Sequence, residues 1–183
     1  ARSIWENLFS ACVLISPLET GDTTVHRIHK SGIPYLSLGR IDSLPDCSSA
    51  TVDYELGAYQ STKFLIERGH RSIAMLRAFP GFQPGVDRRR GYARALEEAG
   101  IRVDDRLIQS VTFTGTNIAN TIHRLLVDTG VTALVDCSAR EDAASIREGT
   151  RRAGRRPGSD FEVVVWTYNN ERPKMGIGGI TPA

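Results

Sequence analysis

The chain has 183 residues, of which 40% are hydrophobic and 24% are charged, and its formal net charge is +2. This composition excludes a disordered chain, and no apolar run approaches the roughly 18 residues that a membrane helix needs. A charge this close to neutrality also argues against a nucleic-acid-binding surface within this stretch, because phosphate binding needs an excess of Lys and Arg.

The apolar pattern alternates between helical and strand periods along the chain. Helices are expected at residues 3–10, 23–31, 54–68, 88–99, 117–129 and 140–153, and strands at residues 12–16, 34–38, 72–77, 107–113, 132–136 and 162–167. Five helices are followed by glycine, which adopts the left-handed conformation most easily: Gly32, Gly69, Gly100, Gly130 and Gly154. The alternation, without hairpin turns, predicts an α/β fold with mainly parallel sheets and helices on both faces.

Cysteines and histidines give no sign of a cofactor or metal. Cys12, Cys47 and Cys137 are far apart and form no C-x-x-C pair, which favours reduced thiols in a cytoplasmic protein. His26 and His29 share a helix face without a further ligand at a convincing spacing, so a solvated face is favoured over a metal site. The chain begins without Met, and we expect it to be a piece of a longer protein.

Ligands of parallel α/β sheets bind beyond the carboxyl ends of the strands, where loops lead into helices. Loops that meet this condition span residues 16–22, 39–50, 77–87, 137–140 and 167–171. The sequence contains neither a G-x-x-x-x-G-K-[ST] phosphate loop nor a G-x-S-x-G elbow, which argues against two large enzyme classes.

Three consecutive arginines mark the loop at residues 77–87 as the most informative. Arg88, Arg89 and Arg90 are expected in the first turn of a helix, where the helix dipole disfavours cations. One explanation is a surface cluster paired with Asp87, Glu97 or Glu98. The other is a ligand site, because a guanidinium suits sugar hydroxyls, a carboxylate or a phosphate.

Several strings resemble the LacI/GalR family of bacterial transcription regulators. Residues 52–76, VDYELGAYQSTKFLIERGHRSIAML, resemble the crossover into the family's C-terminal subdomain, and DRRRGYARALEEAGIRVDDRLI at residues 87–108 is similar to its effector-site helix. VTALVDCSAREDAAS and GSDFEVVVWT look like diverged forms of its last two strand units. The pieces occur in the family's order.

The resemblance implies a periplasmic-binding-protein-like fold, in which two α/β subdomains close on a small effector. Residues 1–50 would be part of the N-terminal subdomain, residues 51–168 the C-terminal subdomain, and residues 169–183 a return crossover. The family forms homodimers that bind operator DNA through a helix-turn-helix head, and no segment here reads as that head.

Candidate effector-binding residues follow from the resemblance one at a time. Arg88 stands three residues before Gly91, where the family's arginine grips the effector, and Phe113 matches a position at which some members stack an aromatic ring. Asp53 matches an acidic residue near the crossover between the subdomains.

Two other positions depart from the family pattern. Ala139 and Arg140 replace the usual Asn-Asp pair, and Thr167 replaces the usual Asp after the last strand. Both changes remove acceptors for sugar hydroxyls. We therefore expect weak binding of neutral sugars, and either an anionic effector that pairs with Arg88 and Arg140 or a loss of effector binding.

The leading hypothesis is a ligand-sensing regulator that is not an enzyme, with a sugar-like or anionic effector. A periplasmic solute-binding protein of a transporter is the alternative, and an α/β enzyme that uses Arg88 is a weaker one, since no nucleophile, base or metal set supports it. A near-neutral charge fits a sensor domain whose DNA contacts lie in a separate head. An apolar face near residues 3–16 is expected to be open.

Overall fold

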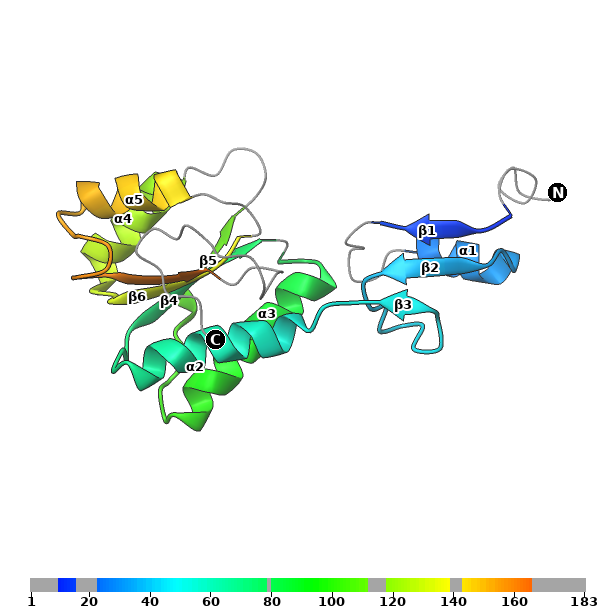
Figure 1. The fold of residues 1–183 in the computed structure, drawn as a ribbon, viewed down its shortest axis with the longest axis horizontal. Coiled ribbons are helices and arrows are strands. Elements are labelled where there is room, and N and C mark those ends of the chain that lie inside the picture. The colour runs from blue at the N-terminus through cyan, green and yellow to red at the C-terminus, as the bar shows by residue number, and fades with distance from the viewer. Residues whose placement is uncertain (1–9, 16–22, 79, 112–117, 139–142, 166–183) are drawn as a thin grey trace.

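The computed structural model describes residues 10–15, 23–78, 80–111, 118–138 and 143–165, and these form two parallel sheets (Figure 1). The first, here called the N-terminal sheet, has the order β1-β2-β3, and the second, the C-terminal sheet, has the order β5-β4-β6-β7. Every strand pair is parallel. The α/β class with parallel sheets is therefore confirmed.

The N-terminal sheet consists of β1 (Cys12–Leu14), β2 (Tyr35–Leu38) and β3 (Ser49–Ala50). In helix α1 (Thr24–Ser31), the His29 ring is hydrogen-bonded to the Tyr35 hydroxyl of β2, and the His26 ring is hydrogen-bonded to Ser43 in the loop after β2. The sequence analysis missed β3, which has only two residues, both small. It lies just before the chain continues into the second sheet (Figure 1).

The strands of the C-terminal sheet are β4 (Ile73–Ala78), β5 (Ile108–Val111), β6 (Ala133–Cys137) and β7 (Glu162–Val165). Helices α2 (Tyr54–Glu67) and α3 (Gln83–Glu98) cover one face, and α4 (Ile118–Thr129) and α5 (Ala143–Arg152) cover the other. A short 3-10 turn, Asp105–Leu107, precedes β5.

Alternate residues of each strand build two cores. Met75 and Val135 face α2 and α3, together with the fully buried Tyr92, whose hydroxyl donates to the Ile73 carbonyl at 2.7 Å. Leu76 and Leu134 face the opposite layer of α4 and α5. This two-sided burial is why the strands read as continuous apolar runs.

Backbone geometry confirms the predicted helix ends. The five glycines after helices all have positive φ, between 64° and 93°: Gly32, Gly69, Gly100, Gly130 and Gly154. Other elements agree with the sequence prediction to within a few residues in the described part of the chain. The expected helix at residues 3–10 lies outside it.

The start of α3 was predicted wrongly. The helix begins at Gln83 with Phe82 as its N-cap, five residues before the predicted Arg88, and Asp87 lies inside it rather than capping it. Pro84 and Gly85 read as loop residues in the sequence. Proline, however, is favoured in the first helical turn, where its missing N–H removes no hydrogen bond.

Candidate functional site

Arg88 lies inside the molecule, on the side of α3 that faces the C-terminal sheet. Its residue exposure is 4%, and its guanidinium carbon is 4.6 Å from the centre of the Tyr54 ring at the start of α2. Its positive charge acts on the thiol of Cys137, the last residue of β6. Arg88 is therefore placed at the carboxyl edge of the sheet, where ligands of this architecture bind.

The guanidinium of Arg88 is incompletely satisfied. Within the described residues, Nε and Nη1 are buried and donate no hydrogen bond, and no carboxylate forms an ion pair with this side chain. An unpartnered buried donor costs about 1–3 kcal/mol, and more when it is charged. A side chain in this state is suited to an acceptor supplied by a ligand.

Its two neighbours behave differently. Arg89 pairs with Asp105 at 2.8 Å, and Arg90 pairs with Asp87 and Glu55 at 2.5 Å each. These two members form the surface cluster that was one of the two explanations. Of the three partners proposed in the sequence, only Asp87 is used by the cluster.

The helix-dipole argument for this cluster is wrong. Because α3 begins at Gln83, all three arginines lie beyond the first turn, and the free N–H groups of the helix start are remote from them. The burial of Arg88 and its missing partners distinguish it instead.

Cys137 and Asp136 complete the end of β6 beside Arg88. Burial raises the pKa of the Cys137 thiol to about 12, against the opposing charge of Arg88, so the thiol stays protonated at neutral pH. Asp136 is buried and accepts the backbone N–H of Ser138 at 2.9 Å. A neutral sulfur and an oriented carboxylate thus face the same edge of the sheet.

Arg77 is a second arginine at this edge, which the sequence analysis missed. It occupies the carboxyl end of β4, opposite Cys137 in the parallel register. Its Nε is buried without a partner among the described residues, and burial together with the nearby Arg89 charge lowers the pKa of its guanidinium. A charged residue ending an otherwise apolar strand was the available signal.

Of the remaining predicted site residues, one lies within the described part of the chain and three lie outside it. Asp53 is exposed and caps α2, its Oδ1 accepting the Leu56 N–H at 2.8 Å. It also lines a hollow of about 460 Å³ with Tyr54 and Asp87. Phe113, Arg140 and Thr167 lie outside the described residues. Their roles, and that of Asp53 toward an effector, stay predictions.

Metal binding and membrane insertion are two other possibilities for the described ranges. No group of three metal-ligating side chains occurs there. No described helix is both long and apolar enough to span a membrane.

Comparison with known proteins identifies the family. Residues 8–170 match the family described as periplasmic binding proteins and sugar binding domain of LacI family. Among curated proteins, the chain is 32% identical over 155 residues to the HTH-type transcriptional regulator CelR of Thermobifida fusca, covering 83% of this chain and 45% of that protein. It is 37% identical over 91 residues to the HTH-type transcriptional regulator RafR of Escherichia coli, covering 50% of this chain and 26% of that protein.

Among solved structures, a transcriptional regulator CelR–cellobiose complex superposes with a TM-score of 0.74 at 29% identity, covering 86% of this chain and 49% of that chain. The chain thus spans less than half of these relatives. The match over most of its length shows that it belongs to the family of periplasmic binding proteins and sugar-binding domains of the LacI family.

Proposed function

We propose that this chain is the effector-binding part of a ligand-sensing bacterial transcription regulator of the LacI type. A small molecule bound at the carboxyl edge of the C-terminal sheet would change the affinity of a separate helix-turn-helix head for operator DNA. Its relatives CelR and RafR are HTH-type transcriptional regulators, which favours this function over the solute-binding protein of a transporter and over an enzyme.

The observation that carries the proposal is the state of Arg88. A buried cation without a hydrogen-bonding or ionic partner among the described residues destabilises the ligand-free protein, unless a ligand supplies the acceptors. Tyr54 covers one face of the guanidinium, which leaves the nitrogens at its edge to bind an acceptor.

For the effector we propose a sugar-like molecule or small metabolite with an anionic group. No described carboxylate forms an ion pair with Arg88, and Arg77 adds a second positive charge to the same edge. A carboxylate or phosphate forms bidentate, charge-assisted hydrogen bonds with a guanidinium fork. Phe113, Arg140 and Thr167 remain proposed contacts, as does Asp53.

The wider assembly is part of the same proposal. It includes three expectations that the resemblance to the family implies: a division into subdomains at residues 50 and 168, a homodimer, and a cytoplasmic location. In that setting the effector binds one of two arrangements of the regulator more tightly than the other, and this difference in affinity shifts the equilibrium between them.

The test uses the full-length protein. DNA sequences that it binds are first recovered by selection from a random pool, and a fluorescent duplex then reports binding by anisotropy. Cellobiose, D-glucuronate and glucose 6-phosphate are added separately. We expect an acidic compound to change the affinity for DNA and cellobiose to act more weakly. Failure to select any DNA sequence would contradict the regulator assignment, and a dominant response to cellobiose would contradict the anionic effector.

A further inference from the structure

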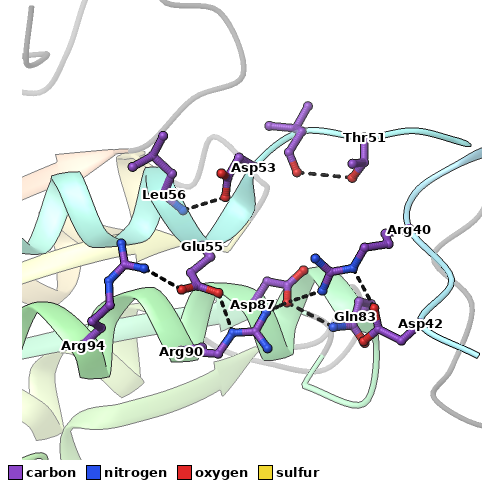
Figure 2. Close-up of polar contacts among 11 residues, drawn as sticks. Arg40, Asp42, Thr51, Asp53, Glu55, Leu56, Gln83, Asp87, Arg90 and Arg94 are labelled. Carbon is purple, nitrogen blue, oxygen red and sulfur yellow. Dashed lines mark hydrogen bonds and ion pairs between the residues drawn. The ribbon is translucent and has the colours of Figure 1, made fainter. Parts of the chain in front are cut away.

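An ion pair joins the two halves of the described structure next to the proposed effector arginine. Arg40, in the loop after β2, donates from Nη2 to Oδ1 of Asp87 on α3 at 3.2 Å (Figure 2). The two residues are 47 positions apart, and they belong to different sheets with their helices. This contact is additional to the covalent connection between β3 and α2.

The Asp87 carboxylate is mostly buried and accepts several hydrogen bonds. Its side chain is 10% exposed, and the same Oδ1 also accepts from Gln83 at 3.0 Å and from Arg90 at 2.5 Å. Two of these three donors belong to α3 itself. Arg40 is the donor that comes from the other half of the molecule.

The cation is held from its own side as well. Arg40 Nε donates to Asp42 at 2.6 Å, so the guanidinium is oriented within its loop before it reaches across. On the α3 side, Arg90 and Arg94 both pair with Glu55 of α2 (Figure 2). A continuous chain of charge pairs therefore runs from the β2 loop to the packed pair of helices α2 and α3.

The covalent connection beside this ion pair, residues 51–53, borders a hollow. The hollow of about 460 Å³ is lined by residues 51–56 together with Arg40, Asp87 and Arg94. Residues 51–53 belong to no helix or strand, and the Thr51 and Asp53 side chains are exposed. Because the hollow leaves the connection loosely packed, the Arg40–Asp87 ion pair helps to restrain the orientation of the N-terminal sheet relative to α3.

Asp87 immediately precedes Arg88 on the same helical turn. A shift of α3 that moves Arg88 toward a ligand moves the Asp87 carboxylate with it, because both belong to one rigid backbone segment. Arg40 would follow this shift or lose its contact. Asp87 and Arg88 are adjacent in the chain, so no intermediate side chains are needed to link their movements.

We propose that Asp87 is a positioning residue that couples ligand contact at Arg88 to the orientation of the N-terminal sheet through Arg40. The regulatory meaning of this coupling rests on the proposed function, but the coupling itself does not. It makes α3 the element that carries both the effector contact and the contact with the other half.

The coupling is tested by hydrogen exchange of the full-length protein without any ligand. Arg40→Gln should speed exchange of the amides at residues 85–90, and Asp87→Asn should speed exchange at residues 39–44, each by about two- to fivefold, as expected for a partly exposed ion pair. The double variant should show little more than either single change. Arg40→Lys should restore most of the protection.

Two control variants separate coupling from local damage. Asp46→Asn changes an exposed carboxylate of the same loop that pairs with neither Arg40 nor Asp87 among the described contacts, and it should leave residues 85–90 unchanged. Arg89→Gln removes a cation of α3 that pairs with Asp105 instead of Asp87, and it should leave residues 39–44 unchanged. Effects confined to the neighbourhood of each substitution, or additive effects in the double variant, would overturn the proposal. Reciprocal effects in a protein that selects no DNA would uphold the coupling and reject the regulator function.

Discussion

Arg88 differs from its two neighbours on α3 in what surrounds its charge. Arg89 and Arg90 neutralise carboxylates at the surface, while Arg88 is buried against an aromatic ring with two nitrogens unpartnered in the described structure. Native proteins retain such costly groups mainly where function requires them. We therefore expect Arg88 to lower the stability of the ligand-free protein and to strengthen the binding of the effector.

Replacing Arg88 by Met tests this expectation. Met keeps the apolar length of the side chain and removes the unpartnered nitrogens, so we expect the free energy of unfolding to rise by about 1 kcal/mol, after the lost contact with Tyr54 is subtracted. Urea unfolding of the ligand-free protein measures the change. Arg89→Met, at a half-exposed ion pair, serves as the control and should change stability by less than about 0.5 kcal/mol. A large loss of stability in Arg88→Met would identify the guanidinium as a structural group.

Glu162 gives a second prediction, for the pH dependence of stability. It pairs with Arg68 at 2.6 Å and with His70 at 2.9 Å, where His70 also bonds to Thr132. Burial acts to raise the pKa of Glu162, but the hydrogen bonds and charges of Arg68 and His70 outweigh it, and the net pKa is lowered.

A lowered folded-state pKa means that the stabilisation is complete above the ordinary value near 4.5 and is lost as the pH falls through the folded-state value. We expect Glu162→Gln to be less stable than the wild type at pH 7 and at pH 4.5, with the difference shrinking as the pH is lowered further in steps. Urea midpoints at these pH values measure it, with the exposed Glu67→Gln as control. A difference that stays constant with pH would show that the ion pairs contribute nothing.

Sequence reasoning singled out Arg88, whose role toward an effector stays a prediction, and missed its contacts for a physical reason. The resemblance fixed its position before Gly91, but the dipole argument failed because α3 starts earlier. The ring contact with Tyr54 and the bond from Arg40 to Asp87 join residues more than 30 positions apart. Such contacts depend on how α2, α3 and the β2 loop pack, which no local pattern encodes.

At the scale of elements, two glycines set how closely helices approach each other. A Cβ on Gly91 of α3 would lie 2.0 Å from the Glu55 carbonyl oxygen of α2, and a Cβ on Gly149 of α5 would lie 2.5 Å from the Ala119 carbonyl oxygen of α4. Both helix pairs therefore pack with one backbone directly against the other.

Gly91→Ala should separate α2 from α3. We expect a loss of about 3 kcal/mol or more in the free energy of unfolding, because all three atoms nearest the new methyl group are backbone and cannot rotate away. Gly81→Ala is the matched control, since a Cβ there meets nothing within 4 Å, and it should change stability by less than about 0.5 kcal/mol. Equal thermal midpoints for the two variants would refute this packing.

Most elements could be predicted because their signals are local. The glycines after helices and the apolar runs of β4 and β6 depend on residues next to each other in the chain. The errors lie where local rules compete: Pro84 is both a loop residue and a first-turn residue, and β3 is too short to show a period. Tertiary contacts decide such cases.

At the scale of the whole molecule, the N-terminal sheet leaves an apolar face open. Val13 and Leu36 are partners in the parallel register, and both are exposed, as are Ile15 and Leu38. Val13 and Ile15 fall within the range where an open apolar face was expected, and the rest of that range is outside the described residues. The division into subdomains at residues 50 and 168 stays a prediction, although the last strand of the N-terminal sheet ends at Ala50, the first of these positions.

Isothermal titration calorimetry of the full-length protein tests the central claim most directly, by comparing the wild type with Arg88→Met. The account predicts that D-glucuronate or glucose 6-phosphate binds the wild type more tightly than cellobiose does, and that Arg88→Met weakens this binding by about 10- to 100-fold, the value of a charge-assisted hydrogen bond. Equal affinity of an acidic compound for both proteins, or tight binding of cellobiose alone, would contradict it.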